Sequence, residues 1–245
     1  MSKVNAKGQL SGAVGPVYFR VLNGQGIVQA KPGRGKVKQA QATKRNASDF
    51  GVASSTAKKI RLAVGSLLKL QTDPMHYRRL TAKVHEAMLT GNDSPKGSRT
   101  LAGGTPKVLE GFQWNDRVNF GKSCLLAPVI SLATSNRITV DIANTAVREA
   151  LAMPRLAAMG ELFYVVVVLD TAQWSAQSVD IFKIPVAATA TSLPAQQFMT
   201  EPIPQGSLVL VIAALQYFSA HSAMGAAPLE TKTGFPAEIS GEKTI

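Results

Sequence analysis

The spacing of apolar residues changes near residue 100, and this change limits the fold more than any other feature of the chain. Between about Ser48 and Leu70, apolar residues recur every three or four positions, as on one side of an amphipathic helix. Beyond residue 107 they gather in runs of strand length, and Arg137–Ile142 alternates strictly between apolar and polar. The pattern predicts an α+β protein with its helices in the first half and antiparallel strands in the second.

A β-hairpin is predicted ahead of the helices. Val17–Leu22 is rich in strand-forming residues, Gly26–Ala30 resumes extended structure, and the dipeptide Asn-Gly between them is a strong hairpin signal. Two earlier glycines permit a bend or a close backbone approach. The structural residues predicted for this hairpin are Gly12, Gly15, Asn23 and Gly24.

A second helix is predicted directly after the first. Asp73 and Pro74 form a helix-start signal, and Gly91 is suited to end the helix. Two amphipathic helices joined by a short connection are expected to pack as an antiparallel pair. Residues 91–107 are rich in Gly, Ser, Thr and Pro and resemble a linker. We therefore expect a basic hairpin-plus-helical module over residues 1–100 and a separate β domain over residues 101–245.

The second half predicts an antiparallel β-sandwich of the immunoglobulin-like type, because short strands alternate with turn signals. The continuous apolar run Val165–Leu169 predicts a central, buried strand. A short helix is expected near Thr145–Leu151, and the Gly- and Pro-containing tail from Gly225 is expected to end loosely. The predicted strands are Leu125–Leu132, Arg137–Ile142, Glu161–Asp170, Val179–Pro185 and Ser207–Phe218.

Positive charge is concentrated in the first half of the chain. Residues 1–100 contain 18 Lys and Arg against four Asp and Glu, whereas residues 101–245 contain nine against 11. This asymmetry predicts an anion- or partner-binding surface on the N-terminal module. Its candidate residues are Lys31, Arg34, Lys36, Lys38, Lys44, Arg45, Lys58, Lys59, Arg61, Arg78 and Arg79.

These cations leave two interpretations open. Several of them could neutralise nucleic-acid phosphates, and binding would then weaken steeply with salt. The basic run has no interleaved aromatic residues for base stacking, and no known nucleic-acid-binding motif is evident. Solvated charge or contact with an acidic protein is the other interpretation.

No catalytic or metal-binding arrangement emerges from the sequence. Asp116–Ser123 ends in Gly-Lys-Ser as a P-loop does, but Asp116 occupies the position of the first glycine. His76 and His85 fall on opposite faces of a helix, and the single cysteine, Cys124, has no partner for a zinc site or an intramolecular disulfide. We expect no enzyme activity, no metal and no cofactor.

The sequence also predicts a location within the cell. The N-terminal region lacks the uninterrupted apolar run of a signal peptide, and no window reaches the length of a membrane-spanning helix. A cytoplasmic protein is expected, unless it is exported by a route without an N-terminal signal.

The opening of the chain resembles that of an uncharacterised family common in Bacteroidota. The likeness covers residues 7–70 and rests on Lys7-Gly8, Ser11-Gly12, Val14–Val17, Phe19-Arg20, Gly24, Ile27-Val28, Lys31-Pro32, Gln39–Arg45 and Phe50. Members of the family begin with a glycine-rich hairpin, continue with a basic helix and end in β-rich domains. Similar openings occur in phage-like structural proteins.

The resemblance and the composition together favour a non-enzymatic adaptor or assembly component that binds another protein through a β-sheet edge or face. By its organisation the chain is similar to RemZ-type accessory proteins of Bacteroidota secretion and gliding systems. The alternatives are a nucleic-acid-binding protein that uses the basic module, and a phage-like structural protein. The oligomeric state and the identity of the partner do not follow from the sequence.

Overall fold

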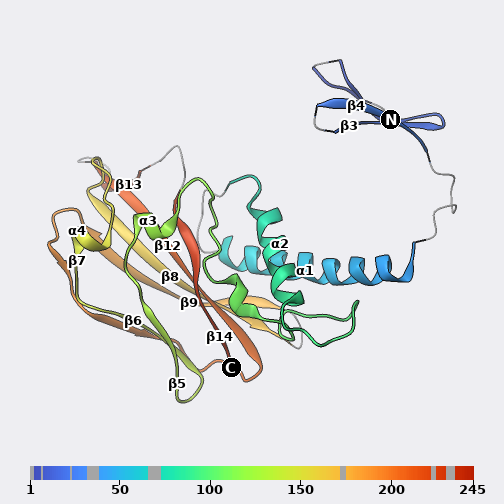
Figure 1. The fold of residues 1–245 in the computed structure, drawn as a ribbon. Helices are drawn as coiled ribbons and strands as arrows, with labels where there is room; N and C mark the ends of the chain where they lie inside the picture. Colours follow the sequence, from blue (N-terminus) through green and yellow to red (C-terminus); the bar gives the residue numbers. More distant parts are fainter. Residues whose placement is uncertain are drawn as a thin grey trace. The chain divides into compact units, whose positions relative to one another are not determined.

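The computed structural model confirms the α+β class, with α-helices and antiparallel sheets (Figure 1). It describes residues 3–6, 8–22, 24–31, 39–65, 73–171, 175–221, 225–229 and 235–245. The chain forms two compact units, residues 1–44 and residues 45–245.

The first unit contains a four-stranded antiparallel sheet in the order β1-β2-β3-β4. The predicted hairpin is confirmed: β3 pairs with β4 from Val17 opposite Ala30 to Leu22 opposite Gln25. Gly15 and Gly24 have φ angles of 55° and 81°, in the left-handed region that these tight turns require. Gly12 is likewise left-handed, whereas Asn23 lies outside the described residues. The strands are β1 (Lys3–Val4), β2 (Leu10–Val14), β3 (Val17–Leu22) and β4 (Gln25–Ala30).

Two helices follow, α1 (Gln41–Gly65) and α2 (His76–Leu89). Each buries one stripe: Ala53, Ala57 and Ile60 on α1, and Leu80 and Val84 on α2. The three- and four-residue spacing predicted these stripes. The helices do not form the expected antiparallel pair, however: α2 crosses the direction of α1, because both helices pack on the central sheet (Figure 1). Helix α1 begins seven residues before the predicted start, because its first two turns carry no apolar stripe to reveal them.

The second unit is built on a central antiparallel sheet. Strand β12 pairs with β8 over 12 positions, from Ser207 opposite Asp170 to Phe218 opposite Met159. Strand β9 flanks β8, while β13 and β14 share the other side of β12. Apolar residues on both faces of β8 and β12 are buried, which confirms that the continuous run after Tyr164 is central. The strands are β8 (Met159–Asp170), β9 (Ala176–Ala187), β12 (Ser207–His221), β13 (Gly225–Pro228) and β14 (Ala237–Thr244).

Different layers cover the two faces of this sheet. Phe163, Val165 and Val167 face a core shared with α1 and α2. Tyr164, Val166 and the other alternate residues face a core shared with a three-stranded sheet, β11-β6-β5 (Figure 1). That sheet consists of β5 (Val129–Ala133), β6 (Arg137–Ile142) and β11 (Gln196–Met199). Shorter elements are η1 (Pro106–Leu109), α3 (Phe120–Ser123), β7 (Thr145–Ala146), α4 (Val147–Ala150) and β10 (Ser192–Leu193).

The division of the chain differs from the boundary expected near residue 100. It falls between Lys44 and Arg45, and the helices belong to the same compact unit as the β domain. The physical reason is the shared core: the apolar stripes of α1 and α2 pack on the central sheet rather than only on each other.

The segment expected to be a linker, residues 91–107, is held in place. Leu101 is fully buried, and the buried amide of Asn92 donates to the carbonyl oxygens of Met88 and Thr100. The buried carboxylate of Asp49 on α1 accepts hydrogen bonds from the backbone N–H of Gly97 at 3.0 Å and from that of Arg99 at 3.2 Å. The Gly, Ser and Pro residues of this segment therefore form tight turns on a packed surface.

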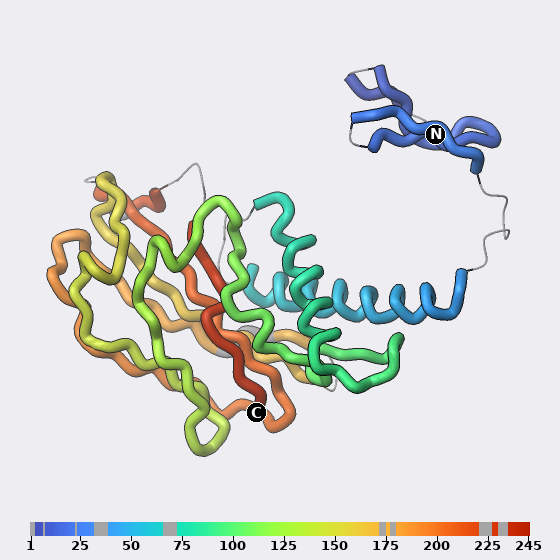
Figure 2. The backbone as a smooth tube through the Cα atoms, viewed as in Figure 1, coloured from blue at the N-terminus to red at the C-terminus, as the bar shows by residue number. Residues whose placement is uncertain are grey.

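The C-terminal segment does not end loosely as expected. Residues 237–244 form β14, which pairs with β12 and lies alongside it (Figure 2). Ala237 and Ile239 are fully buried. Polar residues alternate with them along the strand, so the segment lacks the continuous apolar run that revealed β8 and β12.

We predict that Gly104→Ala will destabilise the second unit by about 1–3 kcal/mol, a typical cost of overpacking. A Cβ atom at Gly104 would overlap the carbonyl oxygen of Ala87 on α2, and backbone cannot move aside as a side-chain end can. The free energy of unfolding in urea measures the effect. The matched control is Gly103→Ala, whose nearest contact is 3.3 Å away at the side chain of Asn92. Equal stability of the two variants would contradict the close approach.

Candidate functional site

A cationic groove of about 370 Å³ lies between α1 and α2. The two helices cover the same face of the central sheet, and their outward sides form its walls. The groove is lined by Gly51, Ser54, Ser55, Ala57, Lys58, Arg61, Tyr77 and Thr81. It thus combines two cations with four hydroxyl groups and contains no carboxylate.

Helical spacing accounts for the lining. On α1, Ser54, Lys58 and Arg61 recur at steps of four and three residues, parallel to the buried alanines. On α2, Tyr77 and Thr81 are four residues apart and face away from the buried Leu80. One apolar stripe on each helix fixes the helix on the sheet, so the polar stripe beside it is directed into the groove.

The side chains of Tyr77 and Arg78 interact with each other at the edge of this groove. The Arg78 guanidinium carbon lies 5.7 Å from the centre of the Tyr77 ring, and Arg78 Nε donates to the Tyr77 hydroxyl at 3.1 Å. The Tyr77 side chain is 43% exposed. An exposed aromatic ring held beside a guanidinium offers a flat stacking surface.

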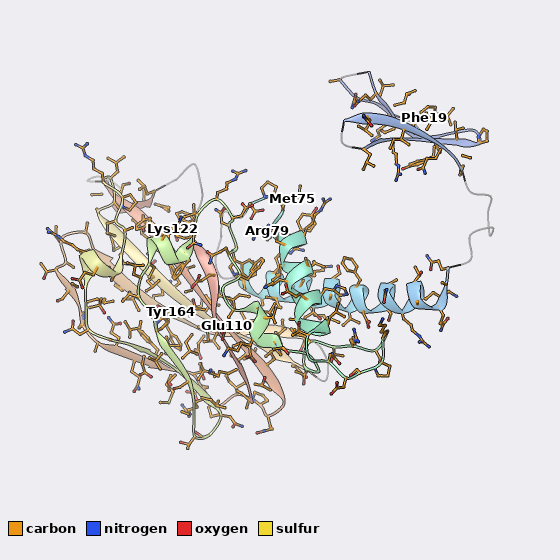
Figure 3. The ribbon with its side chains drawn as sticks, viewed as in Figure 1. Phe19, Met75, Arg79, Glu110, Lys122 and Tyr164 are labelled. Carbon is orange, nitrogen blue, oxygen red and sulfur yellow. The ribbon has the colours of Figure 1, made fainter. Side chains whose placement is uncertain are left out.

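Arg79 has a structural role instead. It forms an ion pair with the buried Asp73 and donates to the carbonyl oxygen of Gln113 at 2.9 Å. Its guanidinium carbon also lies 5.3 Å from the centre of the Phe112 ring. Figure 3 shows Arg79 on α2, on the side toward the β domain. A cation held in this way joins the start of α2 to the segment that follows η1.

The structure brings together only part of the predicted cationic set. Lys58 and Arg61 line the groove, Arg78 borders it, and Lys59 is half-buried on α1. Lys44 and Arg45 are exposed on the first turns of α1, and Lys31 is exposed in the first unit. The remaining three, Arg34, Lys36 and Lys38, lie outside the described residues. The hydroxyl groups of the groove were not predicted, because isolated Ser and Thr residues carry no sequence signal.

Asp73 anchors the start of α2. Its Oδ1 accepts a hydrogen bond from the backbone N–H of Met75 at 2.8 Å. Burial alone would raise the pKa of this carboxyl, but its bonds to Arg79, Met75 and Asp116 outweigh burial and hold the pKa below the ordinary 3.8. The ionised carboxylate is therefore favoured in the folded state.

We predict that Asp73→Asn will lower the free energy of unfolding at pH 7 by about 1–3 kcal/mol, the range for hydrogen bonds to a charged group. A carboxyl whose pKa falls on folding stabilises the protein above pH 4, and this stabilisation is lost as the pH falls through the lowered value. The difference from the wild type should thus shrink below pH 4 in urea titrations. Asp93→Asn, at an exposed position, is the control; a difference that is independent of pH would contradict this role.

Cys124 lies in the core on the other face of the sheet. Burial raises the pKa of its thiol from 9.0 to about 11, and burial likewise raises the pKa of Tyr164 and Tyr217 in the same core. The Tyr217 hydroxyl donates to the carbonyl oxygen of Ala152 at 2.7 Å. Such a thiol is a weak nucleophile at neutral pH.

We predict that Cys124 will react with a soluble disulfide reagent at pH 8 at least about tenfold more slowly than the same chain in urea, because the folded protein shields the sulfur and its raised pKa lowers the thiolate fraction. The release of the reagent's chromophore measures the rate. Comparable rates with and without urea would show that the thiol is accessible and ionised.

The sheet of the first unit presents a second candidate surface. Antiparallel partners project to the same side of a sheet, so Val14 with Val17, Phe19 with Val28, and Val17 with Ala30 share one face. Val21 joins them by alternation along β3. We call Val14, Val17, Phe19, Val21, Val28 and Ala30 the apolar face; Phe19 is labelled in Figure 3.

Within the first unit, no second layer covers the apolar face. None of the described residues between 3 and 31 is buried, and Val28 and Val14 are 60% and 47% exposed. The opposite face is mixed, with Tyr18 opposite Gln29 and Arg20 opposite Ile27. A contiguous apolar surface on one side of a sheet is a candidate interaction surface.

A second hollow, of about 400 Å³, lies over β6 and β11. Its lining is small and apolar apart from Asp141, Gln196 and Gln197, and Gln197 Nε2 donates to Asp141 Oδ1 at 2.6 Å. Asp141 is the single carboxylate of this hollow, and the bond from Gln197 holds one of its two oxygens.

Neither a metal site nor a membrane-spanning helix is found among the described residues. They contain no group of three or more His, Cys, Asp or Glu side chains placed to hold a metal ion. None of their helices is both long enough and apolar enough to cross a membrane. Comparison of the chain with protein-family models, with curated proteins and with solved structures found no match.

Proposed function

We propose that this chain is a non-enzymatic assembly protein that binds a second copy of itself through the apolar face of its N-terminal sheet. The observation that carries the proposal is the exposure of that face within the first unit, which has valine and phenylalanine side chains across β2, β3 and β4 and no second layer of its own.

A small sheet of this kind needs a covering layer. Protein units are built from at least two packed layers, because an apolar sheet face must be buried against another element. The first unit is far below the size at which a single layer can bury a core of its own. Contact with another polypeptide would provide the missing layer.

The composition of the apolar face suits a second copy as the partner. The apolar face contains no ionisable side chain, whereas Arg20 projects from the opposite face. The chain has a net charge of +12, so two copies repel each other wherever cations meet. A two-fold contact between apolar faces places no cation inside the interface, and sheets readily pack face to face in this way. The cations elsewhere on the two basic units still repel each other and weaken the contact.

The contact is expected to be weak. With strands about 4.8 Å apart and a rise of about 3.3 Å per residue, the face covers about 300 Å², and two faces bury roughly 600 Å². Stable interfaces bury at least about 1,200 Å² in total. Association is therefore expected at micromolar or higher concentrations, which suits an assembly in which several weak contacts act together.

Two finer expectations remain predictions within this proposal. An immunoglobulin-like β-sandwich is supported by the core between the central sheet and β11-β6-β5. A role as an accessory component of a Bacteroidota secretion or gliding system, or as a phage-like structural protein, is consistent with an assembly protein and rests on the resemblance of residues 7–70.

We predict that the mass of the full chain will rise from monomer to dimer as its concentration increases from about 1 µM to several hundred µM, and that Val28→Lys will weaken this association at least tenfold. Such a loss corresponds to about 1.4 kcal/mol, roughly the cost of removing one valine from a buried contact. Sedimentation velocity or light scattering measures the change. Val28 is already 60% exposed, so the substitution costs the isolated sheet little.

The matched control is Gln29→Lys, the neighbouring position on β4, which adds the same charge to the opposite face. Its self-association should equal that of the wild type. A wild-type chain that stays monomeric throughout, or equal losses in the two variants, would refute the proposed contact. Hydrogen exchange of residues 17–22, which should slow with concentration in the wild type only, provides an independent check.

A further inference from the structure

We propose that the groove between α1 and α2 binds single-stranded nucleic acid, with Lys58 and Arg61 contacting phosphates and the Tyr77 ring stacking on a base. This inference does not depend on self-association, because all residues that line the groove belong to residues 45–245.

The cations of the groove are available for a ligand. No carboxylate among the described residues lies within 4 Å of the charged groups of Lys58, Arg61 or Arg78. Other cations nearby are neutralised: Arg79 pairs with Asp73, and Lys83 pairs with Glu86 at 3.1 Å. Positive charge that remains unpaired and is gathered in a concave surface attracts polyanions.

The hydroxyl groups fit a phosphate ligand. Ser54 and Ser55 line the groove beside the two cations, and each can donate a hydrogen bond to a phosphate oxygen. The Thr81 hydroxyl donates to the carbonyl oxygen of Tyr77 at 2.9 Å, so it lines the groove without a donor to spare. Lys, Arg, Ser, Thr and Tyr side chains provide many of the phosphate contacts in nucleic-acid complexes. The groove opens at the first turns of α2, where the helix dipole adds partial positive charge.

The Tyr77 ring favours a nucleic acid over an acidic peptide. An acidic peptide would need the cations but would gain little from an exposed aromatic ring. A single-stranded nucleic acid uses both, since its bases stack on aromatic side chains while its phosphates follow a cationic groove. Arg78 beside the ring extends the flat stacking surface. A base within a duplex is already stacked and paired, so an unpaired strand is the expected ligand.

The charge of the preceding segment supports the same ligand. Residues 1–48 contain nine Lys and Arg and no Asp or Glu. Such a segment attracts a polyanion without sequence preference and increases the rate of encounter. Variants of groove residues therefore separate binding in the groove from the electrostatic attraction of residues 1–48.

The test uses the full chain and a fluorescent 20-nucleotide oligo(dT) or oligo(U), with anisotropy measured from 50 to 300 mM NaCl. Lys58→Gln/Arg61→Gln should weaken binding at least tenfold and make the slope of log K against log salt shallower by about 1.4, because each lost phosphate contact contributes about 0.7. Tyr77→Ala should weaken binding about tenfold and leave the slope unchanged, whereas Tyr77→Phe, which keeps the ring, should bind nearly as the wild type does.

The matched control is Lys122→Gln/Arg148→Gln, which removes one Lys and one Arg from exposed positions outside the groove. Its affinity and slope should stay near wild-type values. Equal losses in both double variants would overturn the groove as the site. Competition by poly-glutamate as strong as that by oligo(U), with no effect of Tyr77→Ala, would identify an acidic protein as the ligand instead. Urea unfolding of each variant verifies that the fold is intact.

Discussion

The pairing of β8 with β12 is the interaction on which the second unit depends. Twelve consecutive positions pair, and nearly every side chain in the middle of both strands is buried. A strand that is apolar on both faces cannot leave either face in water. The sheet therefore requires two covering layers, and the chain supplies α1 and α2 on one face and the sheet of β5, β6 and β11 on the other.

This requirement also determines where binding surfaces can form. Each helix uses one stripe to cover the sheet, which leaves its polar stripe facing outward and creates the groove. Arg79 forms an ion pair with the buried Asp73 and so helps to fix α2. Its neighbour Arg78 instead donates a hydrogen bond to Tyr77 at the edge of the groove. The N-terminal sheet is the opposite case, because within its own unit an apolar face has no second layer. The second unit thus offers a cationic groove, and the first unit offers an apolar face without ionisable side chains.

Sequence patterns predicted the positions of helices and strands better than they predicted which of them pack together. Arg137–Ile142 matches β6 at both ends, since strict alternation is an unambiguous signal. The groove was predicted only in part: Lys58, Arg61 and Arg78 were candidates, but no pattern indicated that Ser54, Tyr77 and Thr81 would join them. Arg79 was a candidate as well, and its pairing with Asp73 depends on the start of α2. Residues 91–107 resembled a linker because Gly, Ser and Pro serve flexible chains and fixed turns alike.

The sequence by itself determined the local structure: the helical stripes, the turn after Leu22, the central apolar strands and the excess of cations in the first 100 residues. These features depend on neighbouring residues, so they can be recognised in a short window. Only the tertiary structure decided that the helices share a core with the sheet, that residues 237–244 pair with β12, and which cations have no carboxylate partner. Each of these outcomes depends on contacts between residues far apart in the chain, and apolar stripes and strand edges do not specify which partner will cover them.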